Sequence, residues 1–482
     1  MDDDPDELAY ANGIDATTGT YLLPPMTAAD IAAAAHSTPV DHNLIAALTK
    51  VADASKAEHF GLPFDINPLD LSQAGWALVI SADEDPAVRA ALEPLVALRT
   101  AQVGDPERLK VLEYKVGDTR QLWLSRHKIA TGSIDPTRVP FYLLIVGCPE
   151  RIPFSFCREL AVEYAVGMLS FDTPAGYAAY SSSVVAAERK ETPPRARRVS
   201  FFATRHAFDA ATQLSADRLV KPLFEGTLSR RVRCQFDSAW AENATHEALT
   251  EILTRKGSSA PAFLFTAGHG MGFPAGHANQ RASQGALLCQ DWAGLQAGPI
   301  ARKQYFAAAD VPDSANVAGL FAFVFACFGG GTPARDRFEH KPGVPPPVLA
   351  DAPFAAALPQ RLLAHPAGGA LGCIAHVDRA WGHSIVQAGA GAQLIPFENA
   401  IGNILLGKPI GWALKDFNER YAALSVSLAN LVEKIETEGL RVPDAQLATA
   451  WIQRNDAEGY ALFGDPAARL RLEPAALTHE SH

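Results

Sequence analysis

The chain has 482 residues, of which 48% are hydrophobic and 20% are charged. These proportions are typical of a globular protein, and the length leaves room for two or three domains. The formal net charge of −11 argues against nucleic acid as a partner, because phosphate binding needs a concentrated basic face. One dense basic run, residues 189–198, is interrupted by prolines, and we interpret it as a solvated linker.

The sequence shows no feature of export or membrane insertion. It opens with acidic residues where a signal peptide carries positive charge, and its longest apolar run, Val317–Phe328, is too short to cross a bilayer. The six cysteines do not follow the paired spacing of zinc sites. We therefore expect a cytoplasmic protein that has no membrane span and uses neither a metal nor another cofactor.

Short apolar runs alternate with helical patterns along the chain. The first 65 residues carry two Ala-rich helical patterns, at residues 27–35 and 42–54, and are expected to form a small N-terminal extension. Later apolar runs are continuous rather than alternating, which is typical of strands buried on both faces of a parallel sheet. Strands are predicted at Trp76–Ser81, Phe141–Gly147, Val199–Thr204, Arg231–Phe236, Ala262–Gly268, Leu320–Ala326 and Gly369–Ala375.

Helical patterns lie between these strands, at Asp85–Arg99, Phe208–Leu223 and Asn243–Arg255. The first of them has an acidic start and a proline at the expected first helical position. The alternation of strand and helix predicts an α/β fold. We divide it into two α/β blocks, residues 66–195 and residues 196–482, which meet at the basic linker.

Two of the predicted strands run into reactive side chains beside glycines. Ala262–Gly268 is followed by His269 and Gly270, and Leu320–Ala326 is followed by Cys327. In an open parallel sheet, functional groups collect outside the carboxyl ends of the strands. A thiolate can attack a carbonyl while an imidazole handles the protons of the leaving amine. The pair predicts acyl transfer, with the N–H groups of Gly270 and Cys327 as oxyanion donors.

Simpler interpretations of these residues stay open. Glycines after a strand often only form a turn, and Cys327 alone could be a buried residue at a strand end. A metal centre is disfavoured, because His269 and His277 lack a third ligand at a spacing that metal sites use.

Four stretches of the sequence resemble the gingipain-type peptidases, which are part of the caspase-like group of cysteine peptidases. They are FLFTAGHG with His269, FAFVFACFGG with Cys327, FAAAL followed by GALGCIAHVDRAW up to Trp381, and YALFGDPAARLRL at Tyr460–Leu472. A fifth stretch, YLLIVGCPERIPF at Tyr142–Phe154, resembles the strand of the smaller subdomain of these enzymes. The resemblance thus extends over most of the chain as separate motifs.

The resemblance implies a caspase-like sandwich of two side-by-side, mostly parallel sheets flanked by helices. Residues 66–195 would form the non-catalytic subdomain and residues 196–482 the catalytic one, with a His269/Cys327 dyad that cleaves a protein or peptide substrate. A role in regulated intracellular proteolysis, including bacterial defence, and a regulatory partner protein would fit such an enzyme. The sequence departs from the caspase signature, since Phe325 stands at the position where caspases have a Gln before Ala-Cys. Unlike the secreted gingipains, the chain is expected to have neither an export signal nor a long prosegment.

Two other functions stay open beside the endopeptidase. The chain could be a catalytically silent caspase-like scaffold or signalling module, or another thiol acyl-transfer enzyme such as a transpeptidase or ligase. A third residue that orients His269 is not required in such sites. Asp237 is the best candidate, because it follows the predicted strand Arg231–Phe236 and should lie at the same sheet edge.

The specificity pocket is expected at Trp381, which matches the Trp in the pocket wall of the resembling family. Asp209 or Asp378 would supply a carboxylate to this pocket, and a buried carboxylate prefers a cationic partner, above all Arg. We therefore expect cleavage after a basic residue. Pairing of Asp378 with Arg379 or Arg335 would weaken this expectation.

Overall fold

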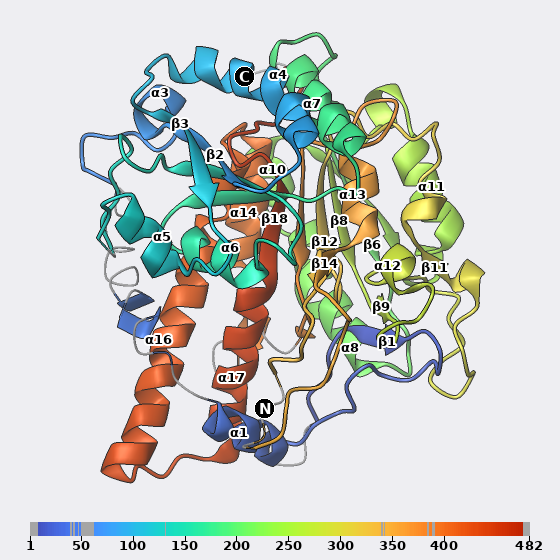
Figure 1. The fold of residues 1–482 in the computed structure, drawn as a ribbon. Helices are drawn as coiled ribbons and strands as arrows, with labels where there is room; N and C mark the ends of the chain where they lie inside the picture. Colours follow the sequence, from blue (N-terminus) through green and yellow to red (C-terminus); the bar gives the residue numbers. More distant parts are fainter. Residues whose placement is uncertain are drawn as a thin grey trace, which may run out of the picture.

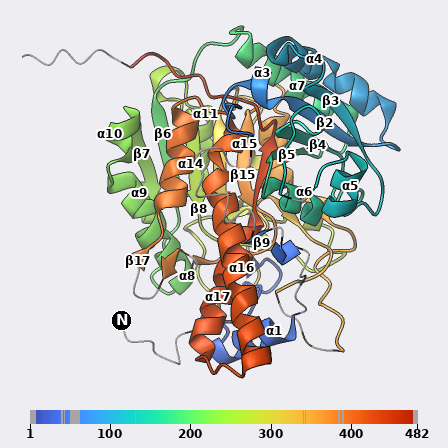
Figure 2. The same ribbon diagram turned by 90° about the vertical axis from the view of Figure 1, so that its left-hand side faces the viewer.

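The computed structural model describes residues 8–38, 41, 44–46, 48–49, 62–130, 132–338, 341, 343–382, 385–387 and 391–475. Its centre is one ten-stranded sheet with helices on both sides (Figures 1 and 2). In spatial order the strands are β3 (Leu109–Tyr114), β2 (Trp76–Ser81), β4 (Tyr142–Val146), β5 (Ala165–Leu169), β18 (Tyr460–Gly464), β15 (Gly372–His376), β12 (Phe321–Phe325), β8 (Phe263–Ala267), β6 (Arg198–Ala203) and β7 (Gln235–Trp240).

The sheet has two parallel halves that run in opposite directions. β18 pairs in parallel with β5 and antiparallel with β15, whereas every other pair in the sheet is parallel. The halves meet where β18 lies antiparallel to β15, with Phe463 paired with Cys373. The expected α/β fold with mostly parallel, helix-flanked sheets is confirmed, and the two side-by-side sheets are joined edge to edge into one.

A buried ion cluster directly after β18 links the C-terminal part of the chain to residues of the N-terminal part that lie in the same half of the sheet. The carboxylate of Asp465 accepts hydrogen bonds from Trp76 Nε1 at 3.0 Å and from Arg99 Nε at 2.8 Å, and Arg99 also pairs with Glu188. Burial of Arg99 opposes its charge, yet the two carboxylates raise the pKa of its guanidinium. Breaking a buried ion pair is costly, because the partner that is left behind keeps a charge that water cannot solvate.

Helices pack on both sides of the sheet, and the long helices α16 and α17 extend together beyond it, with α1 packed against α17 (Figure 1). The helices are α1 (Ala28–Ser37), α3 (Leu71–Ala74), α4 (Pro86–Val103), α5 (Arg120–Arg126), α6 (Phe154–Ala161), α7 (Pro174–Glu188), α8 (Ala210–Ser215), α9 (Lys221–Glu225), α10 (Leu228–Val232), α11 (His246–Thr254), α12 (Gln280–Ser283), α13 (Ala357–Leu363), α14 (Ile395–Leu405), α15 (Ile410–Ala413), α16 (Lys415–Glu438) and α17 (Asp444–Gly459).

A second, smaller sheet lies beside the carboxyl ends of β8 and β12. Its strands, in spatial order, are β1 (Gly13–Asp15), β9 (Gly270–Gly272), β10 (Leu287–Leu288) and β11 (Tyr305–Phe306). Two further pairs are β13 (Gly331–Thr332) with β14 (Phe354–Ala355), and β16 (Val386–Gln387) with β17 (Gly391–Ala392). The smaller sheet brings the N-terminal part of the chain to the edge where His269 and Cys327 lie.

Two expectations about local structure were wrong. The strand predicted at Arg231–Phe236 is displaced, because α10 continues to Val232 and Arg233 ends it in the left-handed region, with φ 51°. The basic run is not a solvated linker at its end, because Arg195 is buried and donates to the carbonyls of Pro261 and Asn316.

Two other expectations are only partly covered by the described residues. The helical pattern at residues 42–54 falls largely outside them. Within the part of the chain that the structure describes, no helix combines the length and the apolar character that a membrane span needs. The division at residues 65/66 and 195/196 stays a prediction.

Candidate active site

The register of β8 and β12 brings His269 and Cys327 to the same edge of the sheet. Ala267 is paired with Phe325, and the two reactive residues each follow this pair by two positions. The loops beyond the pair touch, since a Cβ added to Gly270 would lie 1.9 Å from the carbonyl oxygen of Cys327. Glycine is therefore the residue that fits beside His269, and both reactive side chains are fully buried.

His269 is held by Asp209, the acid that caps α8. Asp209 is the N-cap of α8, where its Oδ2 accepts from the Thr212 N–H at 2.8 Å and lies 2.9 Å from His269 Nε2, while its Oδ1 accepts from the Tyr21 hydroxyl. Burial would raise the pKa of Asp209, but the neighbouring His269 ring and these hydrogen bonds lower it below its usual range. Nε2 therefore carries the proton that faces Asp209. Nδ1 is buried and has no hydrogen-bond partner among the described residues, so it is free to act as a base.

The structure corrects the sequence-based placement of two acids. Asp209 was expected in the specificity pocket, but it contacts His269, because it caps the helix that starts beside the imidazole. Asp237 was expected to orient His269, but its carboxylate pairs with Arg198 and Arg255. The error arose from the displaced strand, since Asp237 is the third residue of β7 and does not follow its end.

The thiol of Cys327 and the two expected oxyanion donors surround a single peptide group. The N–H of Gly270 and the N–H of Cys327 donate to the same oxygen, the carbonyl of Asn12, at 3.0 and 3.1 Å. Sγ of Cys327 accepts from the Ala380 N–H at 3.3 Å. Burial raises the pKa of this thiol to about 12, which keeps it neutral in the structure as it stands. The next residue, Phe328, has φ 57°, an uncommon conformation for an aromatic residue beside a reactive group.

Asn12 belongs to a part of the chain that the sequence did not connect with the site. The segment enters beside Trp381, where Ala11 forms an antiparallel bridge, and leaves through β1, which pairs in parallel with β9. A Cβ added to Gly13 would lie 3.0 Å from both Cβ and Sγ of Cys327. Residues 11–13 therefore fill the space in front of the thiol.

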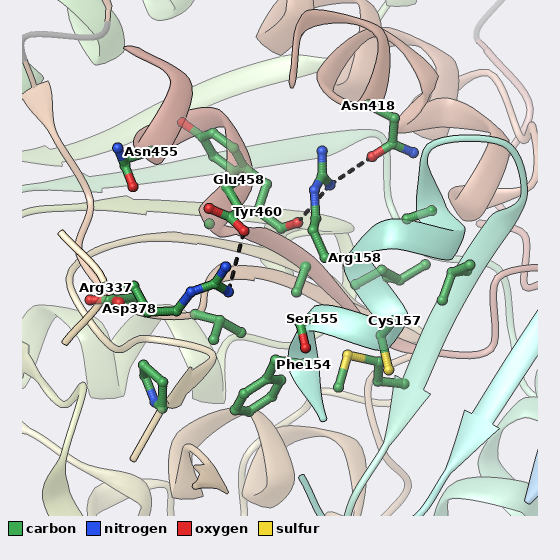
Figure 3. Close-up of a pocket in the computed structure, with 18 of the residues that line it drawn as sticks. Phe154, Ser155, Cys157, Arg158, Arg337, Asp378, Asn418, Asn455, Glu458 and Tyr460 are labelled. Carbon is green, nitrogen blue, oxygen red and sulfur yellow. Dashed lines mark hydrogen bonds and ion pairs between the residues drawn. The ribbon is translucent and has the colours of Figure 1, made fainter. Parts of the chain in front are cut away.

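Trp381 and Asp378 lie on a cavity that does not contain the reactive pair (Figure 3). The Trp381 ring is buried and stacks on Phe338 at 4.5 Å, while its backbone N–H donates to Asp456. Figure 3 shows Asp378 next to Arg337 among the residues that line this cavity. Neither His269 nor Cys327 is among the residues that line this cavity, and the expected role of Trp381 and Asp378 in specificity stays a prediction.

Asp378 is already engaged by its neighbour in sequence. Its Oδ1 accepts from the Arg379 backbone N–H at 2.8 Å and lies 3.5 Å from the Arg379 guanidinium. Burial raises the pKa of Asp378 to about 6, against the lowering effect of Arg379. Asp378 should therefore bind a basic side chain of a substrate more weakly than the sequence suggested.

No protein-family model matches the chain, and no curated protein matches its sequence. Two solved structures are similar at 12% identity. One, described as "Structure of Protease", has a TM-score of 0.48 over 87% of this chain and 82% of the other. The other is the complex of the pro- and mature domains of RgpB from Porphyromonas gingivalis, with a TM-score of 0.43 over 82% of this chain and 80% of the other. At identities this low, the residues of the site itself have to support any function.

Proposed function

We propose that the chain is a cysteine endopeptidase in which Cys327 attacks the peptide carbonyl and His269 transfers the protons. One observation carries this proposal: the N–H groups of Gly270 and Cys327 converge on one peptide carbonyl oxygen directly beside the thiol. When a nucleophile adds to a carbonyl, negative charge develops on that oxygen. Two fixed N–H donors stabilise this charge and so lower the barrier to attack.

The remaining residues take supporting roles in the proposed reaction. Nδ1 of His269 accepts the thiol proton and then delivers it to the leaving amine, since this atom has no other partner among the described residues. Asp209 holds Nε2 in the protonated form and stabilises the imidazolium that forms during attack. As the resemblance to gingipain-type peptidases implies, the enzyme would act in regulated proteolysis inside the cell, under the control of a partner protein.

The proposal is tested by substitution and by labelling of the full-length chain. Cys327→Ala and His269→Ala should each lower peptide hydrolysis by a factor on the order of 10³ or more, because the two residues act as a unit. Cys373→Ala is the matched control, since Cys373 is an equally buried thiol on the neighbouring strand β15. An electrophilic peptide probe should label Cys327.

Each result bears on one of the alternatives. Substantial hydrolysis by Cys327→Ala would refute the proposed nucleophile. A chain that cleaves no peptide in a complete library and is never labelled at Cys327 supports the silent scaffold. Products joined to an added amine, rather than hydrolysed, would indicate a transpeptidase or ligase.

A further inference from the structure

The backbone of Asn12 is held in the manner of a bound substrate. Its carbonyl oxygen receives the two N–H donors of Gly270 and Cys327, and its own N–H donates to the Ala380 carbonyl at 2.9 Å. One residue earlier, Ala11 pairs antiparallel with Trp381. Strand-like pairing of this kind is a general way to bind an extended peptide. The carbonyl carbon beside the thiol is therefore that of Asn12, and the next bond is Asn12–Gly13.

The side chain of Asn12 fills a fully buried polar pocket. Oδ1 accepts from the Gly382 N–H at 3.1 Å, and Nδ2 donates to the Ala211 carbonyl at 3.5 Å and to Ser215 Oγ at 3.4 Å. Ala211 and Ser215 lie one turn apart on α8, so one face of this helix supplies both acceptors. The backbone donor of Gly382 and the backbone acceptor of Ala211 fix the orientation of the amide.

Other side chains match this pocket less well. A carboxylate would place an oxygen against the Ala211 carbonyl, with no proton between two acceptors. A lysine or arginine would bring a charge to a pocket whose two flanking acids along the chain, Asp209 and Asp217, are already paired with other residues. The three groups that bond the Asn12 amide line none of the cavity at Trp381 and Asp378. The pocket thus recognises a primary amide.

The chain on the far side of the bond is also anchored. Gly13 begins β1, which continues along β9, and the next residue, Ile14, is buried among Met271 and Trp292. Gly13 packs so closely on Cys327 that an added Cβ would lie 3.0 Å from Sγ. Both sides of the Asn12–Gly13 bond are therefore fixed in front of the nucleophile.

Resting on the peptidase function proposed above, we propose that the enzyme cleaves after asparagine and that the Asn12–Gly13 bond is its own first substrate. Sγ of Cys327 bonds to the carbonyl carbon of Asn12, the thiol proton passes to His269, and the C–N bond to Gly13 breaks as His269 protonates the leaving amine. Water then hydrolyses the thioester, which restores the thiol and leaves a carboxylate on Asn12. The cleft stays blocked until this segment departs.

Self-cleavage is tested on the full-length chain by intact mass and N-terminal sequencing during incubation. The wild-type chain should convert to a species that begins at Gly13, and Cys327→Ala should stay uncut. Asn12→Ala and Asn12→Lys should be cut at least tenfold more slowly, because they leave pocket groups unpaired. Asn279→Ala, which replaces an exposed asparagine, is the matched control and should be cut like the wild type. A wild-type chain that stays intact, or an Asn12→Lys chain that is cut as fast, would overturn the proposal.

Specificity is tested with added peptides that copy residues 9–12, acetyl-Ala-Tyr-Ala-Xaa-aminomethylcoumarin, in which Xaa is Asn, Asp, Lys or Arg. The Asn peptide should have a kcat/KM at least tenfold above the other three. Preference for Lys or Arg overturns the asparagine pocket but leaves the peptidase intact. Hydrolysis of no peptide, together with no labelling of Cys327 by an electrophilic probe, would instead refute the peptidase itself.

Discussion

Replacing Asp209 by asparagine isolates the charge of the acid that contacts His269. The new amide oxygen can keep the two bonds of Oδ2, from His269 Nε2 and from the Thr212 N–H. The amide N–H groups then face the Tyr21 hydroxyl oxygen, which can accept. The N-cap of α8 survives, and the imidazole keeps the tautomer in which Nδ1 is free.

The size of the effect follows from the difference between charged and neutral hydrogen bonds. A hydrogen bond to a charged group contributes about 1.5–3 kcal/mol, and one between neutral groups about 0.5–1.5 kcal/mol. The substitution therefore removes about 1–2 kcal/mol of stabilisation from the imidazolium that forms during attack. With tenfold in rate for about 1.4 kcal/mol, kcat/KM should fall roughly 5- to 30-fold. Asp209→Ala should also lower the free energy of unfolding by about 0.5–2 kcal/mol, because the cap is lost.

The assay compares kcat/KM on one peptide with thermal unfolding of the same proteins. Asp237→Asn is the control, since its carboxylate pairs with Arg198 and Arg255 and does not contact His269. This control should keep kcat/KM within about twofold of the wild type. Full activity of Asp209→Asn, or an equal loss in the control, would refute the role given to Asp209.

The same variant makes a prediction about pH. The pKa of Asp209 is lower in the folded state than the value near 4 of an unfolded aspartate. Its ionisation therefore stabilises the fold above about pH 4, and this contribution is lost as the pH falls through the lower folded-state value. The difference in unfolding free energy between wild type and Asp209→Asn should shrink below about pH 4 in urea titrations. A difference that grows on acidification would contradict it.

Three further substitutions or labels probe the closed cleft and the core. Before self-cleavage, iodoacetamide should modify the exposed Cys148 well ahead of Cys327. Burial raises the pKa of Cys327 to about 12, which lowers the fraction of reactive thiolate by a factor on the order of 10³. Equal modification rates of the two cysteines in peptide mass mapping would contradict this. Gly13→Ala should displace residues 11–13 from Cys327 and so speed the removal of this segment by limited proteolysis. Gly402→Ala is the control and should leave the digestion unchanged, because a Cβ at this position meets its nearest atom at 3.5 Å. Asp465→Ala should lower the free energy of unfolding by about 1–3 kcal/mol, since the buried Trp76 N–H loses its acceptor while Arg99 keeps Glu188. A loss below about 0.5 kcal/mol would contradict this.

The central strands were predictable from the sequence because burial on both faces leaves a continuous apolar run. Trp76–Ser81 was predicted with the bounds that the structure has, and every residue of β12 is buried. β3 was missed because it is an edge strand, where Lys110 and Glu113 break the apolar run. An edge strand is recognised by its partner rather than by its own composition.

The juxtaposition of His269 and Cys327 was also predictable, because both residues follow buried strands that turn out to be neighbours in register. The acid behind His269 was not. We assigned this role to Asp237 because it directly follows the predicted strand Arg231–Phe236, and we assigned Asp209 to the specificity pocket instead. An error of a few residues at Arg231–Phe236 was enough to favour the wrong acid.

The placement of Asn12 beside Cys327 could not be predicted from the sequence for a physical reason. Asn-Gly is the usual signal of a tight hairpin turn, because glycine tolerates positive φ. Gly13 instead begins a strand and is absent from the positive-φ residues of the described chain, so its lack of a side chain serves close approach to Cys327. Both uses of glycine look the same in one sequence. They are told apart only by the group that lies against the Cα, and here that group comes from a strand end more than three hundred residues further along the chain.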